Sequence, residues 1–245
     1  MTAGEVPAGA VQGGARPLLE RICRACVASL PISGAAVSVM IPGGHRGVVF
    51  ATDDTAGRIE DAQFTTGTGP GIAAFELGSV VLVPDLARIE SPADDDWPAF
   101  RETADGLGVR AVFAFPLRLG AASLGALTLY HVDVCVLEGP DLGTAVRLSD
   151  AAALALLDLI VGLIDGAGLG EIATSTTSHA GYFRSEVYQA AGMVMEQLGV
   201  SIEVAMVRLR SHAFATERST AEVARDIVRR RLRLEADNDR TSEQP

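Results

Sequence analysis

The sequence contains no lysine. All 20 basic residues are arginine, and 31 acidic residues outnumber them, which gives a formal net charge of −11. Acidity of this size argues against non-specific binding of the whole chain to nucleic acid or to anionic membranes. Cysteine is also scarce. Three residues are too few for a disulfide scaffold, so a reducing compartment is expected.

Long hydrophobic runs are missing as well. The most apolar stretch, residues 151–164, is 14 residues long and contains Asp158. A membrane-spanning helix needs roughly 20 apolar residues. The first residues also lack the basic start and apolar centre of a secretory signal. We therefore expect a cytoplasmic protein that does not enter a membrane.

Motifs of enzyme active sites are absent from the sequence, which has no GxSxG, HExxH, GxxxxGK(S/T) or GxGxxG pattern. The four histidines, at positions 45, 131, 179 and 212, are scattered. Cys23 and Cys26 form a lone CxxC with no second pair to complete a zinc site, so buried apolar side chains are the better interpretation. We predict a protein that is not an enzyme and that uses no metal or cofactor.

The first 140 residues change repeatedly between helical and strand-like spacing of apolar residues. Helical spacing over 17–30 and 98–107 flanks several β-type runs, and residues 120–122 join the last two runs as a hairpin. The expected strands are 35–41, 48–51, 80–83, 110–119 and 123–131. This mixture predicts an α+β fold, preceded by a loose tail.

A heptad pattern begins after Pro140. Its apolar and small residues are spaced 3-4-3-4-3-4, which predicts one helix over 141–165 with a single seam. The seam consists of Leu142, Ala145, Ser149, Ala152, Leu156, Leu159 and Leu163. It either packs on its own domain or pairs with the same helix of a second chain, and we prefer the pairing, which predicts a homodimer.

The charge reverses near the C-terminus. Residues 166–180 are rich in Gly, Ser and Thr and predict a linker, after which residues 180–234 carry nine arginines and six acids, a net charge of +3. Apolar spacing predicts three helices there: about 182–198, then 201–215 with Ser201 as N-cap, then a third opened by a capping box over 219–222.

Arginines on these helices are candidates for contacts with nucleic acid. Arg208 and His212 are four residues apart and share a helix face, beside Arg184 or Arg218 if the helices pack closely. Together with Arg210 they have few acids nearby, so they are the preferred contacts to phosphates or bases. The competing interpretation is a solvated surface.

The last helix carries a stripe of three further arginines, at positions 225, 229 and 233. Glu222 and Asp226 lie three or four residues from members of this stripe, so ion pairs within the helix are expected to neutralise part of it.

A small-molecule pocket is a second candidate site. Aromatic walls with a few polar groups are typical of such pockets, and we expect one around the glycine-rich loop 67–71. Its candidate residues are Gly69, Asp85, Trp97, Phe100 and Phe113. The alternative is that these aromatic side chains belong to the core.

Two regions resemble known families. The stretches 66–71, 80–86, 108–111, 116–119 and 124–130 (TGTGPG, VVLVPDL, GVRA, PLRL and LGALTLY) resemble a GAF domain. The stretch 187–195 (VYQAAGMVM) resembles an ANTAR domain. So do Ser201, Glu203, Ala205, Leu209, Arg210, Ala213, Glu222, Val223 and Ala224, which follow it in order.

The resemblance implies a bacterial regulator. Its GAF-like domain would be an antiparallel sheet flanked by helices that senses a small molecule or a protein. Its ANTAR-like domain would be a three-helix RNA binder that acts as a dimer on paired hairpins of a nascent transcript, so that a terminator fails to form. The implied RNA contacts are Arg184, Gln189, Gly192, Arg208, Arg210, His212 and Arg218.

This sequence departs from the family patterns at three places. Ala191 stands where the ANTAR motif often has a lysine, which removes a phosphate contact that such a cation could make. In the glycine-rich loop, Thr68 and Gly71 stand where GAF relatives often have an acidic residue and a cysteine.

The resulting organisation has six segments. They are a flexible tail (1–16), a GAF-like sensory domain (17–140), a connecting helix (141–165), a linker (166–180), an ANTAR-like RNA-binding domain (181–235) and an acidic tail (236–245). The main alternative function is a signalling or scaffold protein whose C-terminal helices bind a protein partner instead of RNA.

Overall fold

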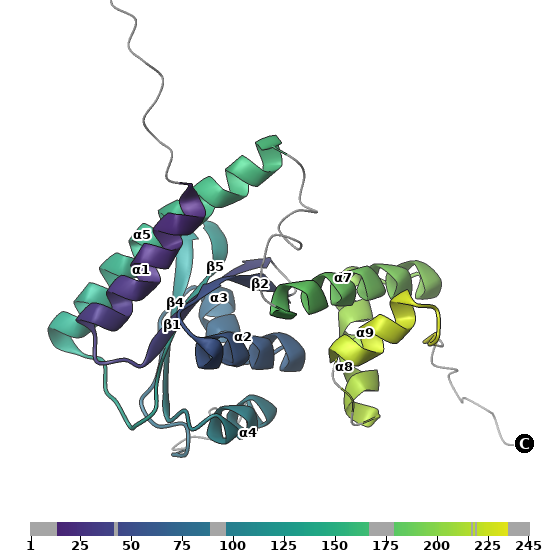
Figure 1. Cartoon of the computed structure of the whole chain (residues 1–245), viewed down its shortest axis with the longest axis horizontal. Helices are drawn as coiled ribbons and strands as arrows, with labels where there is room; N and C mark the ends of the chain where they lie inside the picture. Colours follow the sequence, from purple (N-terminus) through teal and green to yellow (C-terminus); the bar gives the residue numbers. More distant parts are fainter. Residues whose placement is uncertain are drawn as a thin grey trace, which may run out of the picture. The chain divides into compact units, whose positions relative to one another are not determined.

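The computed structural model describes residues 14–41, 44–88, 97–166, 179–216, 218 and 220–234. The chain divides into two compact units, Met1–Glu171 and Ile172–Pro245 (Figure 1). The division falls inside the predicted linker, most of which lies outside the described residues. The exact domain boundaries stay predictions.

The N-terminal unit is built on a five-stranded sheet in the order β2-β1-β5-β4-β3, in which every pair of neighbours is antiparallel. The strands are β1 (Gly34–Ile41), β2 (Gly44–Ala51), β3 (Val81–Val83), β4 (Ala111–Leu119) and β5 (Ala122–His131). β4 and β5 form the predicted hairpin, and Gly120 at its turn has a φ of +59°, which glycine adopts without strain. The predicted α+β class is confirmed.

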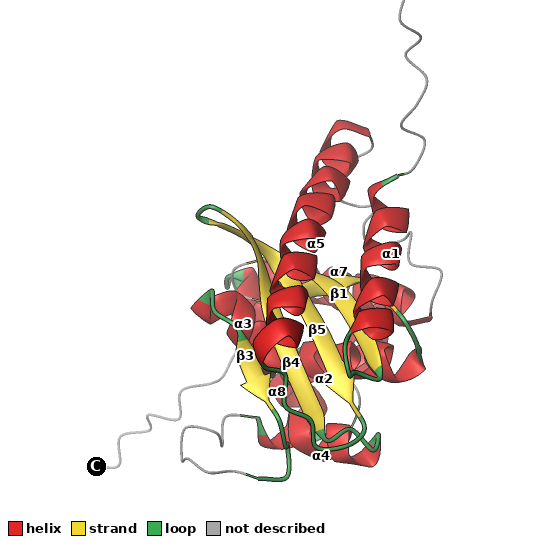
Figure 2. Ribbon diagram, turned by 90° about the vertical axis from the view of Figure 1, so that its left-hand side faces the viewer, coloured by secondary structure: helices red, strands yellow, loops and turns green. Residues whose placement is uncertain are grey.

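Helices cover both faces of this sheet, so the strands are apolar on both sides (Figure 2). On one face α1 (Ala15–Ser29) and α5 (Gly139–Gly166) lie side by side. The other face carries α2 (Asp54–Thr66) and α3 (Pro70–Leu77), and α4 (Pro98–Gly106) packs on α2. Helix α1 begins at Ala15, so the last two residues of the predicted tail belong to it.

Helix α2 has no counterpart among the predicted elements. It begins at an N-cap, where the Asp53 carboxylate accepts a hydrogen bond from the Ala56 amide at 2.8 Å. Its inner face mixes apolar residues with the fully buried polar side chains of Glu60 and Gln63. Buried polar residues break the apolar period on which the prediction of a helix depends.

The predicted seam of α5 packs within its own unit. Ala145, Ala152 and Leu156 have no exposed surface, and Ser149 is 5% exposed. This face contacts α1, β4 and β5, and at Gly125 of β5 a Cβ atom would lie 1.9 Å from the Ser38 carbonyl oxygen and 3.1 Å from Leu156. These four seam residues are therefore used inside one chain, whereas Leu159 is half-buried and the side chain of Leu163 lies outside the described residues.

The C-terminal unit consists of α7 (His179–Leu198), α8 (Ile202–Ala215) and α9 (Thr220–Val228), each in contact with the other two. The three predicted helices are confirmed, and the Ser201 hydroxyl caps α8 by accepting from the Val204 amide at 3.4 Å. Ser219 of the predicted capping box lies outside the described residues. The core between α7, α8 and α9 consists of Val187, Ala190, Ala191, Val194, Ala205, Met206, Leu209, Ala213, Val223, Ala224 and Ile227.

No single helix in the described part of the chain is both long and apolar enough to cross a membrane. The pair Glu186–Leu198 and Ile202–Ala215 reaches the required length and composition only together, with a bend of 108° between them.

Candidate nucleic-acid interface and sensory pocket

The preferred arginines of α8 lie at the flanks of its buried face. Arg208, Arg210 and His212 are all half-buried, because the core residues Leu209 and Ala213 lie between and beside them. Arg208 and Arg210 both interact with other groups of the chain. Burial lowers the pKa of Arg210, against a smaller opposite effect of Tyr188. Part of the Arg210 side chain thus serves packing between helices.

Arg218 and Arg225 are held by carboxylates. Arg218, which follows α8, donates to Asp226 of α9 at 2.6 Å, and this contact holds the pKa of Asp226 below its usual range. Arg225 lies 3.5 Å from Glu186 of α7. Both ion pairs join different elements, a kind of neutralisation that the prediction of pairs within the last helix does not include.

The remaining predicted contacts lie on α7. Gln189 is exposed, and a Cβ atom built on the half-exposed Gly192 would have no heavy atom within 4 Å. Ala191 has no exposed surface, so this position faces the core and not a phosphate. The side chain of Arg184 lies outside the described residues.

Four arginines just after α9 are exposed: Arg229, Arg230, Arg231 and Arg233. The candidate contact set omits them, although the run of three consecutive arginines is visible in the sequence. They are left out because ion pairs within the last helix are expected to neutralise its arginines. Helix α9 ends at Val228, so the run leaves the helical stripe on which that expectation depends.

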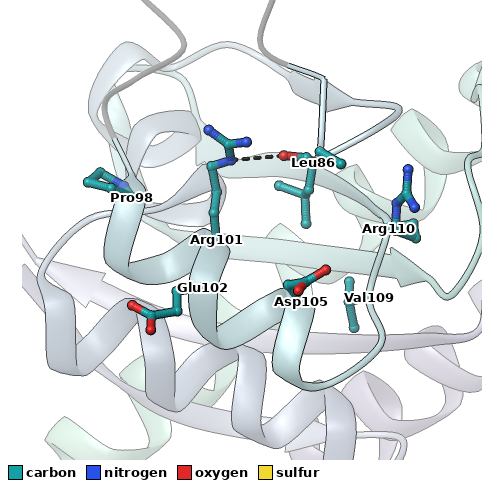
Figure 3. A pocket seen from close by; sticks show the side chains of 8 residues that line it. Leu86, Pro98, Arg101, Glu102, Asp105, Val109 and Arg110 are labelled. Atoms are coloured by element: carbon teal, nitrogen blue, oxygen red, sulfur yellow. Dashed lines mark hydrogen bonds between the residues drawn. The ribbon is translucent and has the colours of Figure 1, made fainter.

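In the N-terminal unit, a hollow of about 420 Å³ lies beside α4 (Figure 3). Its lining is Leu86, Ala87, Pro98, Arg101, Glu102, Asp105, Val109 and Arg110. The walls therefore combine apolar side chains with two cations and two carboxylates. Such a mixture favours a polar ligand over a purely apolar one.

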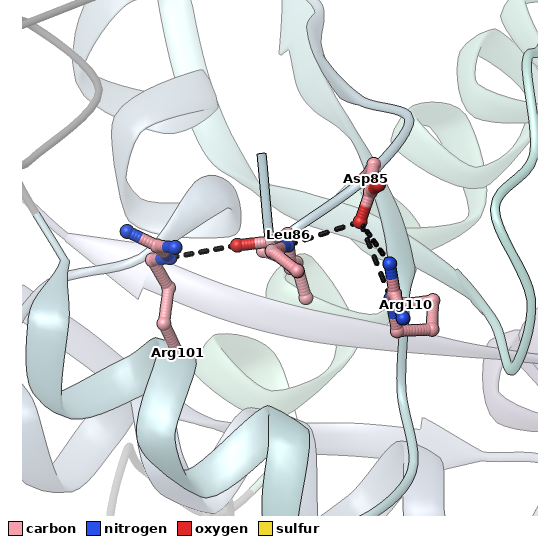
Figure 4. Close-up of polar contacts among 5 residues, drawn as sticks. Asp85, Leu86, Arg101 and Arg110 are labelled. Atoms are coloured by element: carbon pink, nitrogen blue, oxygen red, sulfur yellow. Dashed lines mark hydrogen bonds and ion pairs between the residues drawn. The ribbon is translucent and has the colours of Figure 1, made fainter. Parts of the chain in front are cut away.

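Both arginines of this hollow are fixed by oxygen atoms of the chain (Figure 4). Arg110 donates to the same oxygen of Asp85 at 2.8 and 3.2 Å, and Arg101 donates through Nε to the Leu86 carbonyl at 2.8 Å. The Arg110 hydrogen bond lowers the pKa of the Asp85 carboxyl. Asp85 is therefore not itself a lining residue of the hollow, but it holds the lining residue Arg110.

The structure does not gather the five predicted pocket residues at one place. Phe100 is fully buried, and Trp97 packs against the same apolar cluster, which also contains Val112. Phe113 follows Val112 on β4, so its side chain points to the opposite face of the sheet. These aromatic side chains are core residues, as the alternative interpretation has it.

The glycine-rich loop encloses a side chain of its own unit. A Cβ atom on Gly69 would lie 2.8 Å from Gln63, and one on Gly71 would lie 3.0 Å from both Gln63 and Thr128. The Gln63 amide accepts from the Gly71 N–H at 2.6 Å and donates to Glu60 at 2.8 Å. The glycines leave room for this buried contact, so Gly69 belongs to a packed junction of α2 and α3.

The same junction continues to the sheet. The Ser38 hydroxyl of β1 donates to Glu60, and Ser38, Glu60, Gln63 and Thr128 are all buried. A buried carboxyl needs such hydrogen bonds, because removal from water penalises its charge. Among the described residues, no group of acids, histidines and cysteines could hold a metal ion.

The CxxC cysteines are buried free thiols on α1. Desolvation raises the pKa of Cys26 to about 12 and that of Cys23 further. A thiol reacts as its thiolate, so burial of this kind makes both side chains inert at neutral pH.

Comparison with protein families assigns both units. A GAF domain model matches residues 16–156, and an ANTAR domain model matches residues 183–228. No curated protein matches the chain.

Similar solved structures are GAF domains of low sequence identity. The cyanobacteriochrome TePixJ GAF domain is 14% identical, with coverage of 64% of this chain and 99% of that chain and a TM-score of 0.46. A GAF domain/HD domain protein from Geobacter sulfurreducens is 10% identical, with the same coverage and TM-score. The GAF domain of a two-component sensor histidine kinase from Bacillus halodurans is 8% identical, with coverage of 59% and 94% and a TM-score of 0.45.

Proposed function

Because the chain belongs to the GAF domain family and carries an ANTAR domain at residues 183–228, we propose that it binds paired hairpins in nascent transcripts and prevents termination. The ANTAR domain makes the protein an RNA-binding regulator of antitermination, and the GAF domain is its sensory part. Both domain classes are regulatory and not catalytic. In this proposal the protein acts in the cytoplasm, and a signal at the GAF domain regulates RNA binding.

The charge of the three-helix unit is the observation that carries this proposal. Residues 180–234 have a net charge of +3 within a chain of −11, and several of their arginines are exposed. A cationic surface on a small helical unit suits phosphate contacts, which supply most of the salt-dependent affinity for nucleic acid.

A binding titration tests the proposal directly. The full chain is titrated against a labelled RNA of two hairpins and against a scrambled RNA of equal length, at 50 and 200 mM salt. We expect tighter binding to the hairpins and a marked loss of affinity at the higher salt. Equal affinity for the two RNAs would contradict hairpin recognition.

The proposed homodimer forms through α5, on a different face from the predicted seam. Leu154, Leu157 and Val161 are 58%, 36% and 45% exposed, and their 3-4 spacing matches a helix-pairing seam. With 28 residues α5 is about 42 Å long. Figure 2 shows its C-terminal end extending beyond the strands. A second copy of α5 would cover this stripe.

Two charged substitutions test the dimer. Leu154→Glu with Leu157→Glu should convert a dimer to a monomer in analytical ultracentrifugation, whereas Leu77→Glu, at a 70% exposed position on α3, should not. Loss of the dimer should lower affinity for two joined hairpins by about 100-fold and leave single-hairpin affinity unchanged, because effective concentration is lost. A monomeric wild-type chain would refute the pairing.

The hollow beside α4 is the proposed entry point for a small-molecule signal. Arg101 is its best test, because only its Nε atom is used by the Leu86 carbonyl in the hydrogen bonds described above. A polar metabolite that raises the melting temperature of the wild-type chain should have little effect on Arg101→Gln. An equal shift in both chains would place the ligand elsewhere.

One observation favours the alternative of a protein partner. Val204, Val207 and Phe214 form an outward stripe on α8, and Phe214 is 87% exposed. Exposed apolar stripes commonly mark interaction surfaces. The test is a protein that co-purifies with the wild-type chain and stays bound after RNase treatment. If Phe214→Ser loses this protein and binds RNA as tightly as the wild type, the stripe on α8 binds a protein partner and not RNA.

A further inference from the structure

We infer that the RNA backbone is held mainly by four arginines just after α9, Arg229, Arg230, Arg231 and Arg233, and not by Arg208 and Arg210. This inference rests on the proposed RNA-binding function and names the surface that performs it. We call these four residues the α9-end arginines. They lie beyond residue 228, where the match to the ANTAR model ends.

The backbone that carries the α9-end arginines is firmly held. The Arg229 and Arg230 amides donate to the Arg225 and Ile227 carbonyls at 3.0 and 2.9 Å, and the Arg231 amide donates to the Asp226 carbonyl at 2.7 Å. Beyond them, Leu234 is 7% exposed, and its carbonyl accepts a hydrogen bond from the side-chain NH2 group of Gln197 on α7. The segment is therefore fixed at both ends, which keeps its cations in place before RNA arrives.

The described carboxylates near the α9-end arginines are fewer than the arginines. Asp226 is the acid whose ionisation Arg229 and Arg231 favour, but Arg218 already donates to it at 2.6 Å. Glu222, the other described acid of α9, lies two turns from Arg229. Among the residues that the structure describes, these four exposed cations thus share one carboxylate of α9, which leaves a surplus of positive charge for phosphates; the acids of 235–245 lie outside that part of the chain.

Arg230 adopts a backbone conformation that normally favours glycine. Its φ is +57°, which makes it the one non-glycine residue of the described chain with a positive φ. Helices commonly end with glycine in this left-handed conformation, because a Cβ atom is disfavoured there. An arginine in this disfavoured conformation is consistent with a functional requirement for its side chain.

Arg208 and Arg210 contrast with this surface. Both are half-buried and already interact with other groups of the chain, so their guanidinium groups offer less surface to a phosphate. A structural role for the α9-end arginines is the competing explanation, since cations near a helix C-terminus stabilise the helix dipole. Stability and binding must therefore be measured on the same variants.

The principal experiment uses the full chain and a labelled RNA of two hairpins. Changing all four α9-end arginines to Gln should lower affinity at least about tenfold and reduce the slope of log K against log salt by about three units. Arg208→Gln with Arg210→Gln should have a smaller effect on the slope. Arg58→Gln, at an exposed site on α2 of the other unit, is the control for a lost charge and should leave binding unchanged.

Arg230→Gly separates binding from stability. Glycine suits the positive φ, so this variant should melt at the wild-type temperature or above, yet bind RNA about two- to five-fold more weakly with a slope reduced by about one unit. Arg230→Lys keeps the charge and should retain most of the affinity.

The outcomes distinguish the inference from the function on which it rests. If the wild-type chain binds hairpins and scrambled RNA alike, hairpin recognition fails. If the wild-type chain binds hairpins but Arg230→Gly and the fourfold variant bind equally well, the α9-end arginines are not the contact surface. Full affinity in Arg230→Gly with a raised melting temperature would assign Arg230 no role in binding.

Discussion

Arginines of the two units illustrate two opposite uses of this side chain, although Arg218 and Arg225 of the C-terminal unit also pair with carboxylates. In the N-terminal unit, Arg110 holds Asp85, Arg101 holds the Leu86 carbonyl and Arg118 holds the Gly78 carbonyl at 3.1 Å. In the C-terminal unit, the α9-end arginines stand exposed around one carboxylate that Arg218 already occupies. The same side chain joins segments of one protein in the first case and leaves its donors to a partner in the second.

The two units also differ in the side chains that form their cores. The N-terminal unit buries large aromatic side chains such as Phe100 and Phe113, whereas the described core of the C-terminal unit joins three short helices through aliphatic side chains such as Ala190, Leu209 and Ile227. A small domain has a limited core, so loss of a few contacts weighs heavily there. The comparison separates a larger sensory domain with an aromatic core from a small three-helix unit with exposed arginines.

The most disruptive test of this comparison is Phe100→Ala. Phe100 is fully buried in the cluster between α2, α4 and the sheet, so its truncation should destabilise the N-terminal unit by about 3–5 kcal/mol. In calorimetry with two resolved transitions, only one should move. A shift of both transitions would show that the two units unfold together, and the comparison would fail.

Gln63→Ala tests the buried junction of α2 and α3. Its removal leaves the Gly71 amide and the Glu60 carboxyl without a hydrogen-bond partner that they have in the wild type, at a cost of about 1–3 kcal/mol. Urea denaturation measures the change. Gln189→Ala on the exposed face of α7 is the matched control and should be nearly neutral; an equally small effect of Gln63→Ala would mean that water replaces its contacts.

Ser201→Ala probes the C-terminal unit with a smaller change. Loss of the N-cap of α8 should cost about 1 kcal/mol and should lower the melting temperature of this unit alone. Ser211→Ala, at an exposed position on the same helix, lacks a capping role and serves as control. Equal effects of the two substitutions would show that the Ser201 cap does not stabilise α8.

Acid pH should weaken the ion pairs of both units in the same sense. The pKa of Asp85 is lowered in the folded state by Arg110, so the pair contributes stability above the ordinary carboxyl pKa of about 4 and loses it as pH falls through the lower folded value. The stability difference between wild type and Arg110→Gln should therefore be present at pH 7 and vanish at strongly acid pH. A difference that persists in acid would assign it to packing.

Local patterns in the sequence predict most elements but not the faces on which they are used. The hairpin of β4 and β5 and the three C-terminal helices follow from apolar period and turn residues. The seam of α5 is also visible in the sequence, but its partner is not, because period alone does not say whether a stripe meets its own sheet or a second chain. Phe100 and Phe113 likewise look equivalent in the sequence, but Phe100 of α4 packs in the cluster with Val112, and alternation along β4 turns Phe113 to the opposite face of the sheet.

The sequence by itself determined the two-part organisation, the α+β class and the concentration of arginine near the C-terminus, because these depend on composition and on spacing within short windows. Only the tertiary structure decided that Glu60 and Gln63 are buried, that Ala191 faces the core and that the α9-end arginines are more exposed than Arg208 and Arg210. Burial and charge neutralisation arise from groups far apart in the chain, so they exist only once the helices and strands have packed.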